Sequence, residues 1–312
     1  MNQSTFQEAG PEQAVIDDRV IITGASQSYG TSLLALIGSL NCNWPDHPRV
    51  VVYDLGMSDT DLNQLAKAQI EVRKVPEFCP HWRSDFTWKP WCFRDAPGRS
   101  YLWLDAGTCI LRPMDEAFRA IEQLGYFAVA LYNHPIAPSV PEPLRKNLGL
   151  TSRDMEPMIS ISSGIHGFLK EGPGARLVEQ AYQLALVREN MQATAPPHRH
   201  DQALLTLLLH QYFGPPVLAD YHIYAHHFPT GPGNDSRQKV WVHRRKMLEA
   251  DLQHFIACLN RRGESHRPVG RIAGATPPGV IQRLRIAIAK LRGRFPGHDY
   301  VDLDQTVLHG MK

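Results

Sequence analysis

Short apolar, β-branched runs recur along the first 130 residues of this 312-residue chain, and each is followed by a turn and a helix-like stretch. The first run is 19–23 (RVIIT) and the second is 49–53 (RVVVY), and further strands are predicted at 70–75 and 101–105 (YLWLD). Runs of this kind are typical of parallel strands that are buried on both faces. Because strands and helices alternate through short connections, the sequence predicts an α/β fold with a parallel sheet.

The second half of the chain continues this pattern with longer elements. Strands are predicted at 125–131 and 158–169, helices at 175–188 and 201–213, and short strand-like pieces at 221–225 and 240–243. The stretch 134–143 holds four prolines, which lack the backbone N–H of regular structure, so a loop is predicted there.

Composition limits the class of protein. With 43% apolar and 21% charged residues, the chain is not of the disordered, collagen or coiled-coil type. We expect no signal peptide and no membrane span, since no run of about 18 apolar residues occurs. The five cysteines form no C-x-x-C pair, which argues against a disulfide framework and a zinc knuckle, so reduced thiols in the cytosol are expected.

Positive and negative charges are unevenly distributed along the chain, although they nearly cancel in total. The net charge is +2, yet residues 240–296 carry +9 and the rest of the chain carries −7. Within this basic segment, 280–295 (VIQRLRIAIAKLRGRF) has apolar residues at helical spacing. A basic amphipathic helix of this kind either lies on an anionic membrane surface or packs against the acidic body. No helix-turn-helix or zinc-finger signal accompanies it, so no nucleic acid partner is expected.

The loop after the first strand, 23–30 (TGASQSYG), admits a dinucleotide-binding interpretation. Ser28 replaces the middle glycine of a phosphate-cradling loop, and its side chain would obstruct a pyrophosphate. None of the ten tyrosines has a lysine four residues later, as short-chain dehydrogenases do. An NAD(P)-dependent oxidoreductase of the short-chain type is therefore kept only as an alternative.

Asp105 ends the predicted strand 101–105, and ligands bind at such strand ends in open α/β sheets. A carboxylate there, with Gly107 allowing close approach of the backbone, suits a Mg²⁺ or Mn²⁺ ion that bridges phosphate oxygens. The alternative is that Asp105 only caps the turn that follows.

Residues 101–118 (YLWLDAGTCILRPMDEAF) resemble the strand of GT-A-type nucleotide-sugar glycosyltransferases that runs into an Asp-x-Asp motif, especially in the glycogenin-like retaining group, family 8. Three further matches follow in the same order: 161–165 (ISSGI) resembles an apolar-Asn-Ser-Gly strand, Asp201-Gln202 an acceptor-site motif, and 241–243 (WVH) a late strand whose histidine completes the metal site. The resemblance spans residues 19–246. It implies a GT-A-like (Rossmann-like) mixed, mainly parallel sheet flanked by helices.

The resemblance also implies roles for individual residues. Catalytic roles would fall to Asp105, Asp201 and Gln202, and the metal ligands would be Asp105 and His243. The acceptor would contact His200, Asp201 and His222. The donor would contact residues from all of the motifs: Thr23, Gly24, Ala25, Ser26, Asp54, Lys89, Asp105, Ala106, Gly107, Ser163, Gly164, Arg244 and Arg245.

Gly107 stands where the Asp-x-Asp motif has its second aspartate, so the usual metal site has lost a carboxylate. Three interpretations are open: Asp105 and His243 bind the cation with waters, another acid such as Asp115 helps, or the protein works without metal. In the last case the basic residues 244–246 would neutralise the diphosphate leaving group. The same basic run is also compatible with a solvated surface patch.

The run His198, His200 and Asp201 has two interpretations of its own. It suits a zinc or iron site, or it is a loop followed by a helix N-cap. No G-x-S-x-G elbow, Walker lysine or H-E-x-x-H helix is present, which removes the common hydrolase, NTPase and zincin signatures.

Together these observations predict a glycosyltransferase of the hexosyltransferase type, which moves a sugar from a nucleotide-diphosphate donor such as a UDP-sugar to a glycan, glycolipid or other acceptor. The setting would be polysaccharide or glycoconjugate synthesis, with Mn²⁺ or Mg²⁺ as cofactor. A non-catalytic sugar-nucleotide-binding protein is the alternative that Gly107 suggests.

The predicted organisation has three parts: a flexible N-terminus at 1–18, a GT-A-like domain at 19–246 and a basic helical extension at 247–312. A cytoplasmic protein is expected. If the extension binds lipid, the protein would sit on the inner face of a membrane.

Overall fold

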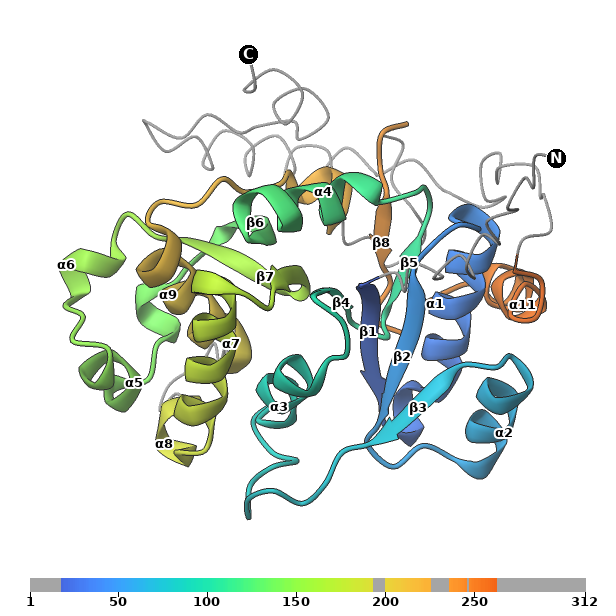
Figure 1. The fold of residues 1–312 in the computed structure, drawn as a ribbon, viewed down its shortest axis with the longest axis horizontal. Coiled ribbons are helices and arrows are strands. Elements are labelled where there is room, and N and C mark those ends of the chain that lie inside the picture. Colours follow the sequence, from blue (N-terminus) through green and yellow to red (C-terminus); the bar gives the residue numbers. More distant parts are fainter. Residues whose placement is uncertain (1–17, 193–199, 226–235, 246, 263–312) are drawn as a thin grey trace, which may run out of the picture.

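The computed structural model describes residues 18–192, 200–225, 236–245 and 247–262 of the chain. Within these residues, a six-stranded sheet has the strand order β3-β2-β1-β4-β7-β6 (Figure 1). Its strands are β1 (Arg19–Ala25), β2 (Arg49–Asp54), β3 (Glu71–Lys74), β4 (Ser100–Leu104), β6 (Tyr126–Pro135) and β7 (Ile159–Leu169). β1 pairs in parallel with β2 and β4, and β2 with β3, whereas β7 runs antiparallel to both β4 and β6. The predicted mixed, mainly parallel sheet flanked by helices is confirmed.

Helices cover both faces of the sheet, because alternate strand residues point to opposite sides. Ile21 and Val52 pack in one core with α1 (Gly30–Asn43) and α4 (Asp115–Leu124). Val20 and Tyr53 pack in the other core with α3 (Trp88–Asp95), α7 (Gly172–Ala185) and α9 (His200–Phe213). The other helices of the described residues are α2 (Asp59–Lys67), α5 (Glu142–Asn147), α6 (Ser152–Met155), α8 (Arg188–Met191), α10 (Tyr221–Tyr224) and α11 (Glu249–Ala257).

A two-stranded antiparallel ribbon lies just beyond the end of β4. It is made of β5 (Thr108–Ile110), which was not predicted, and β8 (Val240–Val242), which was. Thr108 pairs with Val242, so the ribbon places His243 next to Gly107. Two sequence motifs that are far apart in the chain thereby meet at one end of the sheet.

Two local predictions near the site are wrong. Residues 221–225 were predicted as a strand but begin with the helix α10, because the Asp220 side chain accepts a hydrogen bond from the His222 N–H (2.8 Å) and caps the first turn. The interpretation of Asp201 as an N-cap also fails, since α9 begins at His200 and Asp201 lies inside its first turn.

The expectation of reduced thiols is wrong for two of the five cysteines. Cys42, in the last turn of α1, forms a disulfide with Cys258, which directly follows α11. Cys79, Cys92 and Cys109 are free.

The basic segment 280–295 lies outside the described residues, so its predicted helix is not seen. Among the helices of the described part, none combines the length and the apolar character needed to cross a bilayer.

Candidate active site

A cavity of about 1220 Å³ opens at the carboxyl ends of β1 and β4, where ligands bind in open α/β sheets. Its wall combines the loop after β1, the residues after β4, the middle of β7 and the turn after β8. Of the predicted site residues, eleven line it: Gly24, Ala25, Ser26, Lys89, Asp105, Ala106, Gly107, Ser163, Gly164, Gln202 and Arg244. The sequence motifs therefore converge on one cavity.

Lys89 is the central group of this site. Its Nζ lies 2.9 Å from Asp105 Oδ1 and 3.0 Å from Asp201 Oδ2, so one ammonium joins the two predicted catalytic carboxylates. The side chains of Lys89 and Asp201 are only 4% and 7% exposed, whereas that of Asp105 is 41% exposed. Lys89 thus lines the cavity but is almost fully buried, and Asp105 is the more exposed partner.

The surroundings of Lys89 keep its charge in place. Burial lowers the pKa of Lys89, but the charges of Asp105 and Asp201 raise it more, and the net pKa lies above the usual value. Three aromatic rings, those of Phe86, Trp88 and Trp103, lie with their centroids within 6 Å of Nζ. Lys89 is therefore a permanent cation at this site.

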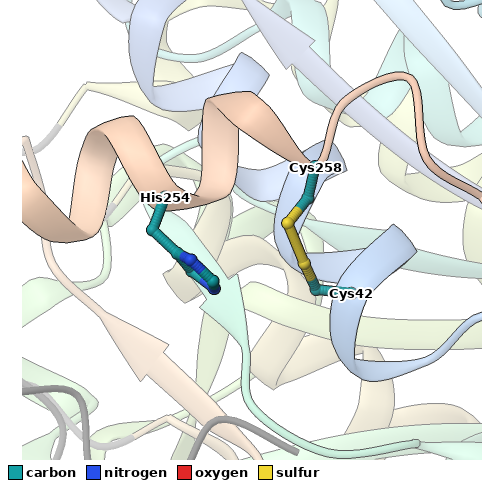
Figure 2. A group of neighbouring side chains, drawn as sticks. All are labelled: Cys42, His254 and Cys258. Carbon is teal, nitrogen blue, oxygen red and sulfur yellow. A yellow bond between two sulfur atoms is a disulfide. The ribbon is translucent and has the colours of Figure 1, made fainter. Parts of the chain in front are cut away.

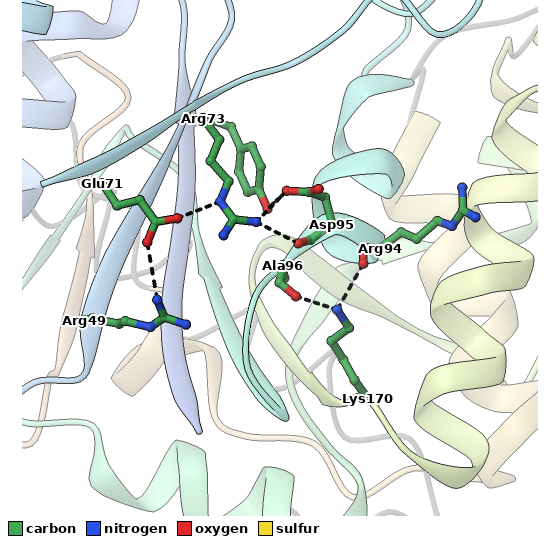
Figure 3. Close-up of polar contacts among 8 residues, drawn as sticks. Arg49, Glu71, Arg73, Arg94, Asp95, Ala96 and Lys170 are labelled. Carbon is green, nitrogen blue, oxygen red and sulfur yellow. Dashed lines mark hydrogen bonds and ion pairs between the residues drawn. The ribbon is translucent and has the colours of Figure 1, made fainter. Parts of the chain in front are cut away.

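Helix α3, which carries Lys89, is held at its far end by a polar network (Figure 3). Arg73 of β3 donates to Asp95 Oδ2 (3.0 Å), which also accepts from the Tyr53 hydroxyl (2.9 Å). Lys170, which follows β7, donates from Nζ to the carbonyl oxygens of Arg94 (3.0 Å) and Ala96. These contacts occupy carbonyls that the helix end leaves unsatisfied, and so they fix α3 against three strands.

Asp105 is held in a defined orientation. Its Oδ1 accepts from Lys89 and from Trp103 Nε1 (2.8 Å). Its Oδ2 faces Gly164: a Cβ at this glycine would lie 2.8 Å from that oxygen, so any side chain there would crowd the carboxylate. Glycine at position 164 leaves Oδ2 open as a hard oxygen ligand.

The turn after β8 brings Arg244 to the cavity and Arg245 over the ring of Tyr29. The N–H groups of His243 and Arg244 both donate to the carbonyl of Gly107 (3.0 and 3.1 Å). Arg244 and Arg245 have φ angles of 47° and 64°, a left-handed conformation that costs about 1 kcal/mol or more for a residue with a side chain. Arg244 lines the cavity, and the Arg245 guanidinium lies 4.8 Å from the centroid of the Tyr29 ring.

Gly107 packs closely against the turn that follows β8. A Cβ at position 107 would lie 3.3 Å from Arg244 Cα, which is closer than ordinary van der Waals contact. A side chain at position 107 would therefore require the β8 turn to shift by a few tenths of an ångström.

His243 lies beside this turn, and its Nε2 is buried without a hydrogen-bond partner among the described residues. It is 1% exposed, and its Nδ1 accepts a hydrogen bond from the Arg245 N–H (3.1 Å). Burial lowers the pKa of His243 to about 4, so the ring is neutral and its proton is assigned to Nε2. Ligation through Nε2 would require this proton to move and the contact with Arg245 to be lost. Of the two predicted metal ligands, Asp105 Oδ2 fits a divalent cation better.

Four other predicted residues, Thr23, Asp54, His200 and His222, do not line the cavity. Thr23 is fully buried in β1, and Asp54 Oδ1 accepts from the N–H groups of Gly56 and Met57 (both 2.7 Å). His200 Nδ1 bonds to the Met191 carbonyl (2.7 Å). His222 uses its backbone N–H in the cap of α10. Their assigned contacts with donor or acceptor stay predictions.

Several residues that line the cavity were not predicted from the sequence: Gln27, Tyr29, Arg83 and His134. Arg83 is the most informative, because it adds a cation to the wall and donates from Nη2 to the Leu55 carbonyl (2.5 Å). No motif surrounds it. The loop position of Tyr29, directly after β1, was the one signal that could have pointed to that residue.

His166 provides a pH probe of the core behind Lys89. It is fully buried on β7, opposite Trp103, and burial together with the Lys89 charge lowers its pKa to about 3. A histidine whose pKa is lowered by folding stabilises the protein when the pH is above 6.5, its pKa in the unfolded chain. This stabilisation is lost as the pH falls toward about 3, the pKa in the folded protein. The free energy of unfolding should fall between pH 6.5 and pH 4 in both proteins. We expect this fall to be about 3 kcal/mol smaller in His166→Leu than in the wild type. Urea unfolding at a series of pH values measures this, and equal slopes for the two proteins would contradict it.

No protein-family model matches the sequence, and no curated protein matches it. Solved structures with a similar arrangement include the galactosyltransferase LgtC in complex with donor and acceptor sugar analogues (12% identity, 80% of this chain, 98% of that chain, TM-score 0.48). Others are the Mn/GDP form of core-mannan synthase A from Aspergillus fumigatus (10% identity, 68% and 75%, TM-score 0.47) and mouse xyloside xylosyltransferase 1 (12% identity, 72% and 96%, TM-score 0.44). These similarities are remote, so they do not identify the chemistry of this chain.

Proposed function

We propose that this protein is a glycosyltransferase that uses a nucleotide-diphosphate sugar, such as a UDP-sugar, as donor and a glycan or glycolipid as acceptor. The observation that carries the proposal is the buried Lys89 ammonium between Asp105 and Asp201, at a large cavity on the carboxyl edge of the sheet. Sugar transfer needs positioning and charge stabilisation more than a protein nucleophile. The groups at this cavity are of that kind.

Different parts of the cavity would bind the nucleoside, the diphosphate and the acceptor. The loop 24–26 would hold the nucleoside, and Arg83 and Arg244 would contact the diphosphate, because guanidinium groups bind phosphate oxygens in a bidentate manner. Gln202 lines the same cavity, and Asp201 lies beside it in α9. We assign this pair to the acceptor side.

In the transfer step, the bond between the anomeric carbon and the diphosphate oxygen breaks, and a bond to an acceptor oxygen forms. The diphosphate leaves with the electron pair of the broken bond, and the proton of the acceptor hydroxyl passes to the departing diphosphate oxygen. Arg83 and Arg244 would stabilise the negative charge on the diphosphate. Lys89 would offset the negative charges of Asp105 and Asp201, which would otherwise repel the diphosphate.

A divalent cation fits this proposal through Asp105. Mn²⁺ and Mg²⁺ prefer oxygen ligands, and Asp105 Oδ2 is an open carboxylate oxygen at the cavity. Such a cation would supply additional positive charge for the diphosphate. With one protein carboxylate, most of its remaining ligands would be diphosphate oxygens and water.

A panel of UDP-, GDP-, CMP- and ADP-sugars tests the proposal. We expect one donor class to raise the melting temperature and to be hydrolysed slowly without acceptor, faster with Mn²⁺ than with a chelator. Binding without turnover of any donor would instead support the non-catalytic binder that Gly107 suggests. If no sugar nucleotide binds, and NADH fluorescence titration shows binding, the proposal is wrong and the oxidoreductase alternative gains support.

A further inference from the structure

Cys42, His254 and Cys258 gather where the end of α1 meets the end of α11 (Figure 2). Their sulfur and ring nitrogen atoms all lie within 4.8 Å of one another. In the described part of the chain, this is the one place where three His, Cys, Asp or Glu ligand atoms come so close together. Cys42 and Cys258 are buried and joined as a disulfide, whereas His254 is exposed.

Helical geometry places His254 and Cys258 on one face. They are four residues apart, at the end of α11, and residues at this spacing lie one turn above each other. Cys42 comes from the last turn of α1, which packs beside α11 (Figure 1). Two ligands from one helix and a third from its neighbour therefore converge on one point.

This convergence does not depend on the disulfide alone. At Gly38, a Cβ would lie 1.8 Å from the Phe255 carbonyl oxygen, so α1 and α11 are in contact through their backbones. Asn41 Nδ2 donates to the carbonyls of Cys258 (3.2 Å) and Leu259 (2.7 Å). These contacts would keep Cys42 and Cys258 together after the disulfide is reduced.

We propose that the reduced protein binds a zinc ion at Cys42, His254 and Cys258, and that disulfide formation excludes this ion. Two thiolates and one imidazole are a ligand set that zinc favours, and the fourth position is open to water because His254 is exposed. The site is soft, in contrast to the hard oxygen ligand at Asp105. It is also separate from the proposed glycosyl transfer and does not rest on it.

The switch between the two forms is a balanced two-electron step. A dithiol reductant is oxidised to its own disulfide while the Cys42–Cys258 bond takes up two electrons and two protons and becomes two thiols. Each thiol loses its proton when it binds the ion. In the reverse direction, a peroxide accepts two electrons from the thiolates and two protons from water, the peroxide bond breaks, the sulfur–sulfur bond forms, and the ion is released.

Cobalt and zinc titrations of the full chain test the proposal. After reduction with a water-soluble phosphine, we expect one Co²⁺ per chain, with a thiolate-to-cobalt charge-transfer band and the visible bands of a tetrahedral site, and displacement of Co²⁺ by Zn²⁺. The His254→Ala variant should bind Co²⁺ at least tenfold more weakly, and since His254 is exposed, its loss should leave the fold intact. The oxidised protein should show no thiolate band.

Cys79 supplies a matched control, because its Sγ lies 3.7 Å from His81 Nε2 and forms a second cysteine–histidine pair. Cys79→Ser should keep the full band. The proposal is overturned if the band persists in Cys42→Ser and Cys258→Ser, or if the reduced wild type shows no band while its circular dichroism is native.

Discussion

Replacement of Lys89 by methionine is expected to lower the free energy of unfolding by about 3–5 kcal/mol. The variant keeps most of the side-chain volume but leaves Asp201, which is 7% exposed, without its cation. A buried carboxylate that loses its partner retains the full cost of desolvation. Urea denaturation followed by tryptophan fluorescence measures the change.

Two further variants separate charge from volume. Lys146→Met removes an exposed lysine that pairs with Glu142 on the surface of α5, and it should leave the stability nearly unchanged. The double variant Lys89→Met/Asp201→Asn removes the orphan charge and should regain part of the lost stability. A double variant that is no more stable than Lys89→Met would show that the loss comes from packing rather than from the unpaired carboxylate.

The ion pairs of Lys89 with Asp105 and Asp201 determine over which pH range Lys89→Met is less stable than the wild type. The folded pKa of Lys89 is raised above its unfolded value of about 10.4, so the stability from its charge is fully present below that pH and is lost only as the pH rises through the folded value. The difference between wild type and Lys89→Met should therefore be constant between pH 7 and 9. A difference that shrinks within this range would mean that Lys89 is not a permanent cation.

The strands of the sheet could be predicted because burial on both faces leaves a mark in the sequence. The runs at 19–23 and 49–53 fall within β1 and β2, and 158–169 overlaps β7 almost completely. β5 escaped prediction because its three residues, Thr108–Ile110, carry too little pattern on their own and exist by pairing with β8. A strand was predicted at 221–225, but the hydrogen bond from the His222 N–H to the Asp220 side chain stabilises the first turn of a helix there.

Part of the cavity lining could be predicted from the sequence, but the contacts between its residues could not. The position of Asp105 follows from the end of a strand, which sequence periodicity reveals. The bridge from Lys89 to Asp201 depends on how α3 and α9 pack on the same core, and no local pattern encodes that. The disulfide between Cys42 and Cys258 closes a separation of 216 residues, and spacing alone does not give such a connection.

Replacement of Asp105 by asparagine is expected to reduce the kcat/KM of sugar-nucleotide turnover by at least about 100-fold, as the loss of one electrostatic group in a preorganised site does. Asparagine Oδ1 can still accept from Lys89 and from Trp103 Nε1, so the fold should be kept. What is lost is the charge at Oδ2, the atom proposed to hold a divalent cation at the diphosphate. A higher Mn²⁺ concentration for half-maximal activity should accompany the lower rate.

Asp115→Asn is the matched control for Asp105→Asn. Asp115 is an exposed acid in the first turn of α4, outside the cavity lining, and was the other acid considered as a cation ligand. We expect its replacement to leave both kcat/KM and the Mn²⁺ dependence unchanged. If Asp105→Asn turns over the donor as fast as the wild type, then Asp105 acts only as a structural partner of Lys89, and diphosphate stabilisation must come from Arg83 and Arg244. If Asp115→Asn alone shifts the Mn²⁺ dependence, the cation is bound from α4 rather than from the end of β4.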